Sequence, residues 1–120
     1  HQGETWVRTD EWYSFEKPAR GDGISVLATL DESTYSPKGP FGGDLRMGDD
    51  HPIIWWHCQN QGRTLYSALG HTGESYAEPE YQQLLLGATR WAMRLEGEGC
   101  SDNRPATPEG ETSTDPQAAE

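Results

Sequence analysis

The stretch PIIWWHCQNQGRTLYSALG, residues 52–70, contains two runs with strand-like composition joined by a short polar link. Residues 52–59 are mostly apolar and begin at a proline, a position that proline tolerates at the start of a strand. Residues 63–70 alternate in character and follow an Asn- and Gly-containing link. Two such runs so close together predict an antiparallel hairpin over residues 53–69.

One further strand and one helix flank this hairpin. Residues 24–31, ISVLATLD, are largely apolar and predict a strand buried on both faces. Residues 78–96 predict a helix, because Pro79 suits its first turn and apolar residues recur at intervals of three and four. That stripe comprises Tyr81, Leu84, Leu85, Ala88, Trp91, Ala92 and Leu95. Gly87 interrupts the helix, and we expect it to allow close packing on the sheet.

The predicted elements do not make a complete three-layer domain. Residues 32–50 predict a Gly- and Pro-rich loop, and one helix covers only one face of a three-stranded sheet. We therefore expect the remaining elements to lie N-terminal to this chain, in a longer parent protein. The chain alone is then expected to fold poorly.

Composition separates a folded part from a polar tail. Residues 96–120 hold seven acidic residues against one arginine, with no aromatic residue and no Val, Ile, Leu or Met. Such a segment buries too little apolar surface to offset its ordering entropy, so we predict a disordered tail or linker there and a folded unit over residues 1–95.

Charge and hydropathy exclude two classes of partner. The net charge is −11 and no cluster of Lys and Arg occurs, which disfavours nucleic-acid binding. No apolar stretch reaches membrane-spanning length. The two cysteines, Cys58 and Cys100, leave open whether they pair, because pairing requires an oxidising compartment.

The motifs occur in an order that resembles a known family. VLATLDESTY (26–35), DHPIIW (50–55) and GRTLYSALGH (62–71) resemble the C-terminal half of a ThuA-like (trehalose-utilisation) domain, and the resemblance covers roughly residues 4–95. It implies an α/β, flavodoxin-like three-layer sandwich of the class I glutamine-amidotransferase type. This chain would supply its C-terminal portion, with a β-hairpin and one long C-terminal helix.

The resemblance also implies a functional setting. ThuA-like domains occur in carbohydrate catabolism, so trehalose or a related disaccharide or glycoside, including 3-keto forms, is the implied partner. A secreted or periplasmic location is implied, with the cytoplasm as the alternative. Two functions remain open: hydrolase, lyase or isomerase-type acid/base chemistry on a sugar, or a non-catalytic carbohydrate-binding or scaffolding module.

His71 is the first candidate for catalysis, because it follows the end of a predicted strand. In amidotransferases of the implied architecture, the histidine of a Cys-His-Glu triad ends an equivalent strand, and Glu74 then stands where it would orient the ring. The nucleophile is missing: Cys58 lies mid-strand without the glycines of a nucleophile elbow, so we reject it. The alternative is that His71 only caps a turn.

Two acidic pairs, Asp10–Glu11 and Asp31–Glu32, supply candidate carboxylates. Adjacent residues on an extended chain point to opposite sides, so each pair directs one carboxylate to the site. We predict Glu11 and Asp31 as catalytic acids, and Asp10 and Glu32 as substrate-binding residues. The alternative is that these acids cap turns.

His51 precedes a predicted strand and is a candidate for substrate binding. Three tyrosines, Tyr13, Tyr35 and Tyr76, are candidates to stack on sugar rings. We expect no cofactor. A divalent metal on His51 and His71 is a weaker alternative, because the chain lacks the H-x-H or H-E-x-x-H spacing of common metal sites.

Overall fold

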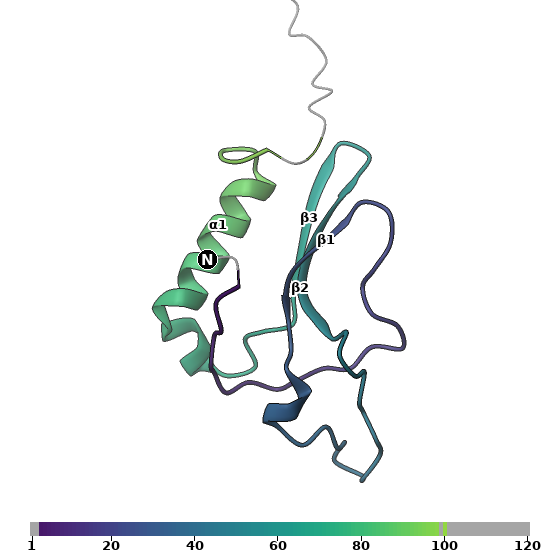
Figure 1. The fold of residues 1–120 in the computed structure, drawn as a ribbon. Coiled ribbons are helices and arrows are strands. Elements are labelled where there is room, and N and C mark those ends of the chain that lie inside the picture. The colour runs from purple at the N-terminus through teal and green to yellow at the C-terminus, as the bar shows by residue number, and fades with distance from the viewer. Residues whose placement is uncertain (1–2, 99, 101–120) are drawn as a thin grey trace, which may run out of the picture.

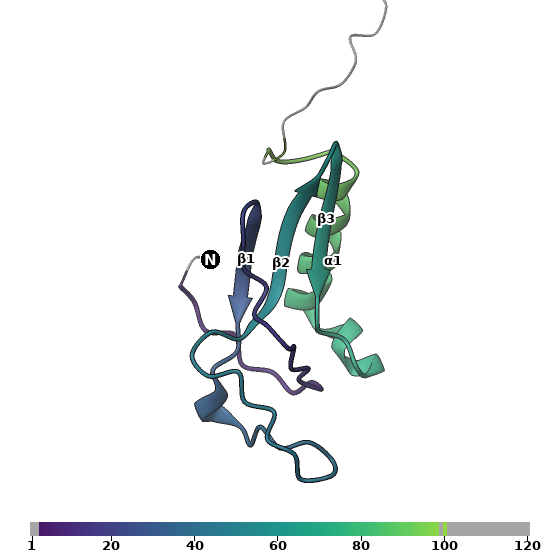
Figure 2. The same cartoon turned by 90° about the vertical axis from the view of Figure 1, so that its right-hand side faces the viewer.

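The protein is described here from a computed structural model, which covers residues 3–98 and Cys100. Three strands form one antiparallel sheet in the order β1 (Ile24–Thr29), β2 (Pro52–Gln59), β3 (Gly62–Ser67) (Figure 2). One long helix, α1 (Pro79–Ala92), follows. The structure is thus a small α/β arrangement, and the predicted antiparallel hairpin is confirmed.

The β2–β3 turn consists of two residues. Gln59 pairs with Gly62, so Asn60 and Gln61 make the reversal. Asn60 has a φ of 54°, in the left-handed region that asparagine adopts more easily than most residues. The polar link in the sequence therefore sets the register of the hairpin.

The strand beginning at residue 24 is exposed at the sheet edge, not buried on both faces as predicted. No residue of β1 is fully buried, and Leu27 is 53% exposed. The reason is its position: β1 pairs only with β2, and that pairing is irregular between Val26 and Thr29. An apolar run alone does not distinguish an edge strand from a central one.

Helix α1 begins where predicted and ends earlier. Pro79 occupies the first turn, and Met93 follows the last helical residue. The chain then reverses at Arg94, whose φ is 60°, so that residues up to 96 do not continue the helix. After the reversal, the Trp91 indole N–H donates to the Glu98 carbonyl at 2.9 Å, which holds the chain against the helix end.

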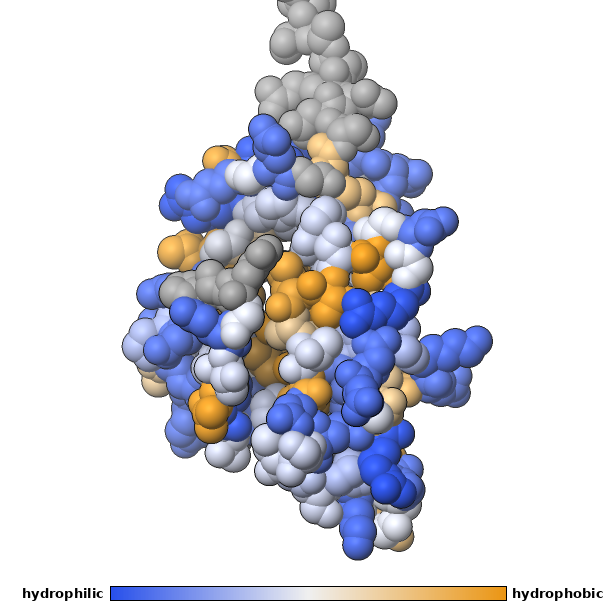
Figure 3. Space-filling view, in the orientation of Figure 1, coloured by the Kyte–Doolittle hydropathy of each residue, from blue (hydrophilic) through white to orange (hydrophobic). Residues whose placement is uncertain are grey.

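The core lies between α1 and the sheet. Its fully buried apolar residues are Ile53, Ile54, Ala68, Leu69 and Tyr81. Figure 3 shows apolar side chains, in orange, gathered between helix and sheet and surrounded by hydrophilic ones. Tyr81 is 2% exposed and its hydroxyl donates to the Leu69 carbonyl at 2.9 Å, so the helix is fixed to the end of β3.

The helix covers one face of the sheet, and the start of the chain, drawn in purple, lies on the same side (Figures 1 and 2). On that side Trp56 packs against Trp91, with ring centroids 5.2 Å apart. On the other side Trp55 stacks on Tyr66 at 4.2 Å, and Phe15 contacts both rings edge-on. The expectation that one helix leaves the second face without a helical layer is confirmed for the described residues.

Cys58 and Cys100 are joined by a disulfide, with Cα atoms 5.7 Å apart. This settles the pairing that the sequence left open. The bond ties the chain beyond α1 to β2. The predicted disordered tail falls, from residue 101 onward, outside the described residues and stays a prediction. Across the described ranges, no helix combines the length and apolar character needed to cross a bilayer.

Gly87 does not serve helix–sheet packing, which corrects the expectation from the sequence. It is exposed, and a Cβ added there would meet nothing within 4 Å. The apolar stripe turns Tyr81, Leu84 and Leu85 to the core and leaves Gly87 on the outer surface. The glycine therefore only weakens the helix.

We predict that Gly87→Ala raises the free energy of unfolding by about 0.5–1 kcal/mol, because alanine loses less backbone entropy in a helix. Denaturant unfolding of the full chain measures it. The control is Gly70→Ala, where φ is +103° and an added Cβ would lie 2.5 Å from the Tyr81 hydroxyl, so stability should fall. A loss of stability in Gly87→Ala would contradict an open outer helix face.

Candidate active site

The end of β1 and the start of β2 lie at the same end of the sheet as the end of β3, because the strands are antiparallel (Figure 1). Glu32 follows β1, His51 precedes β2, and His71 follows β3. From the sequence we expected His71 to share one polar crevice with Glu11, Asp31 and His51. The structure instead places the two histidines in two separate clusters.

His71 forms a close pair with Glu11. Its Nδ1 lies 2.5 Å from Glu11 Oε2, and both side chains are about half exposed, 54% and 49%. The Tyr13 hydroxyl donates to the same Glu11 oxygen at 3.2 Å. A carboxylate on Nδ1 fixes the tautomer and leaves Nε2 to exchange a proton with a ligand. Glu11, Tyr13 and His71, all predicted as site residues, are thus brought together.

The Tyr13 hydroxyl responds to this carboxylate. The negative charge of Glu11, followed by the hydrogen bond to it, raises the pKa of Tyr13 above its usual value. Tyr13 therefore stays a neutral donor at neutral pH, and its hydroxyl helps to orient the Glu11 carboxylate.

Asp10 lies beneath the pair, where groups of the protein itself hold it, and its substrate-binding role stays a prediction. Its carboxylate is fully buried and accepts backbone N–H groups of Glu11, Gly70 and His71, each at 2.9 Å. An Arg8 nitrogen lies 2.9 Å from it. Burial alone would raise the pKa of Asp10, but the three N–H donors and Arg8 outweigh it and leave the pKa below its usual value.

An open pocket of about 600 Å³ adjoins the pair. Acids and small polar residues line it: Thr9, Asp10, Glu11, His71, Thr72, Glu74, Ser75 and Glu78. Glu74 was predicted to orient His71, but Glu11 holds the ring and Glu74 only shares the pocket. Hydrogen bonds from its own backbone N–H and from Thr72 lower the pKa of Glu74, so it is ionised at neutral pH.

Tyr76 does not line this pocket. It follows the pocket wall in the 3-10 turn Gly73–Ala77, and its ring packs edge-on against Tyr81 with centroids 5.4 Å apart. The ring is 52% exposed, so one part of it still faces solvent beside the site. Its substrate-stacking role stays a prediction.

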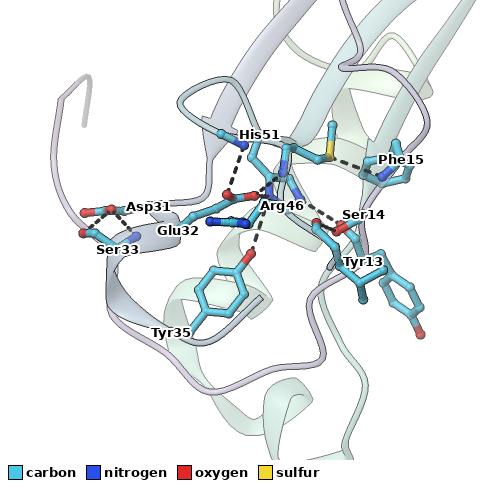
Figure 4. A network of polar contacts seen from close by, with 12 residues as sticks. Tyr13, Ser14, Phe15, Asp31, Glu32, Ser33, Tyr35, Arg46 and His51 are labelled. Atoms are coloured by element: carbon cyan, nitrogen blue, oxygen red, sulfur yellow. Dashed lines mark hydrogen bonds and ion pairs between the residues drawn. The ribbon is translucent and has the colours of Figure 1, made fainter. Parts of the chain in front are cut away.

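The second cluster centres on His51 (Figure 4). The ring is fully buried, with Nδ1 2.8 Å from Glu32 Oε1 and Nε2 2.8 Å from the Tyr13 carbonyl. Because a carbonyl only accepts, Nε2 carries a hydrogen and both ring nitrogens are occupied. Both ring nitrogens of His51 therefore already have protein partners, and its substrate contact stays a prediction.

Glu32 serves as the second anchor of this cluster. It accepts the backbone N–H groups of Met47 at 2.7 Å and Gly48 at 3.0 Å, in addition to His51. The Met47 N–H is the main reason that the pKa of Glu32 lies below its usual value, against the opposing effect of burial. Glu32 thus connects the 32–50 loop to the end of the sheet. These contacts give its carboxylate a structural role that requires no substrate.

Tyr35 lies at the rim of the same cluster, its hydroxyl 3.5 Å from His51 Nδ1 and its ring 6.3 Å from that of Trp12. Burial, with Glu32 nearby, raises its pKa. Asp31 caps the 3-10 turn Glu32–Thr34 through Ser33, whose hydroxyl and N–H donors lower the pKa of Asp31.

Asp31 faces a different, smaller hollow of about 310 Å³, which shares no lining residue with the His71 pocket. The structure therefore does not bring Asp31 to His71, and the turn-capping alternative describes it better. Among the described residues, no group of three or more His, Cys, Asp or Glu side chains could hold a metal ion. A divalent metal on His51 and His71 stays a prediction.

Sequence reasoning missed the role of Arg8. Its side chain is 3% exposed, and its guanidinium lies 4.8 Å from the ring centroids of both Trp6 and Tyr81. A signal was present: Arg8 and Asp10 are two positions apart in an extended segment, so their side chains point to the same side.

We predict that His51→Ala lowers the free energy of unfolding by about 2–4 kcal/mol, because it leaves Glu32 and the Tyr13 carbonyl without their buried partner. Asp31→Ala, one residue from Glu32 but exposed, is the control and should cost much less. Thermal and denaturant unfolding measure both. Equal losses in the two variants would argue against a structural role for the buried ring.

Comparison with known proteins supplies the family. Searches of curated proteins and of solved structures gave no match. The family model for ThuA, described as trehalose utilisation, matches residues 1–92, which include both clusters and all of α1. The protein therefore belongs to the ThuA family.

Proposed function

We propose that this chain acts in the utilisation of trehalose or a related disaccharide or glycoside, with Glu11 and His71 as an acid/base pair. The family supports the carbohydrate association. The observation that carries the chemistry is the 2.5 Å contact between His71 Nδ1 and Glu11 Oε2 beside an open, polar pocket. Half-exposed side chains held in this geometry can reach a ligand without first moving.

The pair suits transfer of a proton at a sugar. Glu11 holds Nδ1, so Nε2 can take a proton from a hydroxyl or from a carbon next to a keto group, and return it to a leaving oxygen. Glu11 stabilises the imidazolium formed in between. Hydroxyls and carboxylates of the pocket wall offer the hydrogen-bonding partners that a sugar needs.

Thiol chemistry of the amidotransferase type has no support in this chain's own cysteines. The sequence holds two, and both are consumed in the Cys58–Cys100 disulfide. The same observation favours the second candidate function, a non-catalytic carbohydrate-binding or scaffolding module, because the pocket then offers an acid/base pair but no thiol nucleophile from this chain.

The disulfide also supports a secreted or periplasmic location, since such bonds persist in oxidising compartments. We further propose that the sheet belongs to a larger flavodoxin-like, amidotransferase-like sandwich, of which this chain is the C-terminal part. The support is the helical layer on one face only and the partly exposed aromatic residues Trp55 and Tyr66 on the other.

The central experiment compares His71→Gln and Glu11→Gln with the unmodified protein on trehalose, other disaccharides and their 3-keto forms. Each variant should lower turnover at least a hundredfold, because general acid/base catalysis commonly contributes 10²–10⁴-fold. Glu16→Gln, an exposed carboxyl outside the pocket lining, is the matched control. Product analysis measures turnover and calorimetry measures binding.

The outcomes separate the two functions. Turnover lost in both pair variants but kept in the control supports the enzyme. Binding without turnover in every protein, including the unmodified one, supports the module. Full turnover in His71→Gln would overturn the proposed role of the pair.

Pocket charge makes a further prediction about substrates. Four carboxylates line the pocket, and the nearest arginine, Arg8, is already balanced by Asp10 at 2.9 Å and Glu78 at 3.3 Å. A phosphate group would therefore meet net negative charge. We expect a phosphorylated disaccharide to bind at least tenfold more weakly than the neutral sugar. Glu74→Gln removes one negative charge from the pocket and should reduce the ratio between the two dissociation constants.

Calorimetric titration with trehalose and its phosphate ester, at low and high salt, measures this preference. Glu16→Gln again serves as control and should leave the ratio unchanged. Equal or tighter binding of the phosphate ester would contradict the charge argument while leaving the acid/base pair untested by that result.

A further inference from the structure

We propose that Asp10 is the positioning residue of the Glu11–His71 pair, with Arg8 as its ion-pair partner beneath the pocket. The inference rests on the proposed role of the pair. It concerns how two side chains from distant parts of the chain are held in contact.

A single oxygen of Asp10 anchors both members of the pair. Oδ1 accepts the backbone N–H of Glu11 and that of His71, each at 2.9 Å. Oδ2 accepts the N–H of Gly70 at 2.9 Å. Because the backbone N–H groups of Glu11 and His71 both donate to this one oxygen, the 2.5 Å contact between their side chains depends on its position.

Arg8 is the cation that faces the buried carboxylate of Asp10. One of its nitrogens lies 2.9 Å from Asp10 Oδ2, and its guanidinium stacks between the rings of Trp6 and Tyr81 at 4.8 Å from each centroid. Within the described part of the chain, its buried nitrogens have ion-pair contacts but no well-directed hydrogen bond. Arg8 therefore acts on Asp10 through charge and through its fixed position.

Loss of the negative charge on Asp10 should break the contact between His71 Nδ1 and Glu11 Oε2. An amide at position 10 retains the shape but has one acceptor oxygen in place of two, while three backbone N–H groups converge on it. At least one N–H then loses its partner, and Arg8 loses its nearest anion. A displacement of the His71 backbone by about 1 Å is enough to break a short side-chain contact.

Other ionisable groups surround His71 and must be accounted for. Glu11 contacts the ring directly and Tyr13 reaches it through Glu11. Glu74 and Glu78 face it across the pocket, and Arg8 lies behind Asp10. A measurement that reports which ring nitrogen of His71 carries the hydrogen distinguishes the effect of the Glu11 contact from the effect of these more distant charges.

The test is the tautomer of the His71 ring, read from ring-nitrogen chemical shifts in proton–nitrogen NMR spectra at a pH where the ring is neutral. A carboxylate on Nδ1 favours the tautomer with hydrogen on Nδ1. In the unmodified protein we expect that tautomer to predominate. Glu11→Gln defines the signature of the lost contact, and Asp10→Asn should reproduce it, with the Nδ1–H fraction falling at least twofold.

Leu84→Val is the control for general loss of stability, because Leu84 packs on the core and does not line the pocket. It should leave the tautomer unchanged. An unchanged tautomer in folded Asp10→Asn would overturn the proposal. If that variant does not fold, Arg8→Gln decides: a shifted tautomer supports positioning by the buried ion pair, and an unshifted one overturns it.

These measurements need no substrate, so they are independent of the turnover assays. A protein without turnover can still show the tautomer change, in which case the positioning stands and the enzyme proposal fails. In the reverse result, the unmodified protein shows turnover and Asp10→Asn leaves the His71 tautomer unchanged. The pair is then catalytic, but Asp10 does not position it. Arg8→Lys, which keeps the charge, should restore most of the unmodified tautomer ratio relative to Arg8→Gln.

Discussion

The fixed position of Tyr81 connects the helix, the end of the sheet and the candidate site. Its hydroxyl donates to the Leu69 carbonyl at 2.9 Å, its ring lies under the Arg8 guanidinium, and its side chain is almost fully buried. Gly70 passes so close that an added Cβ would lie 2.5 Å from the Tyr81 oxygen. Tyr81 therefore restricts the path of the chain after β3, and that path leads to the contact of His71 with Glu11.

Two histidines at the same end of the sheet show how surroundings decide a role. His51 is enclosed, and both of its ring nitrogens are engaged by groups of the protein itself. His71 is half exposed, and within the described part of the chain its Nδ1 is the ring nitrogen that a carboxylate holds. The first arrangement uses the imidazole as a connector between loops, and the second leaves one nitrogen for chemistry. Both residues are histidines at the same end of the sheet, one before a strand and one after a strand.

This contrast explains how far the sequence could predict the molecule. The hairpin, the first strand and the start of the helix followed from local patterns, because turn residues and apolar spacing act over a few positions. The edge position of β1 and the early end of α1 depend on pairing and on the reversal at Arg94, which local patterns do not contain.

The candidate site likewise has features that local sequence predicts and features that only the tertiary fold determines. Glu11 and His71 were predicted from residue type and position, but the partner of His71 was expected to be Glu74, its neighbour in sequence. The actual partner lies sixty positions away and is set by the tertiary fold. The buried ion pair of Arg8 and Asp10 was overlooked for the same reason: an acid beside a candidate site looks like a ligand-binding group until its hydrogen bonds are known.

Burial of that ion pair bears on whether the pocket is built for chemistry or only for binding. A buried carboxylate with a cation is costly to maintain, and a hydrophobic replacement is often as stable. Binding of a neutral sugar through hydroxyls does not require the His71 ring to be held to one carboxylate. Proton transfer does, because it depends on the tautomer and on the distance. The presence of Asp10 beneath the pair therefore favours the acid/base reading of the pocket over the passive one.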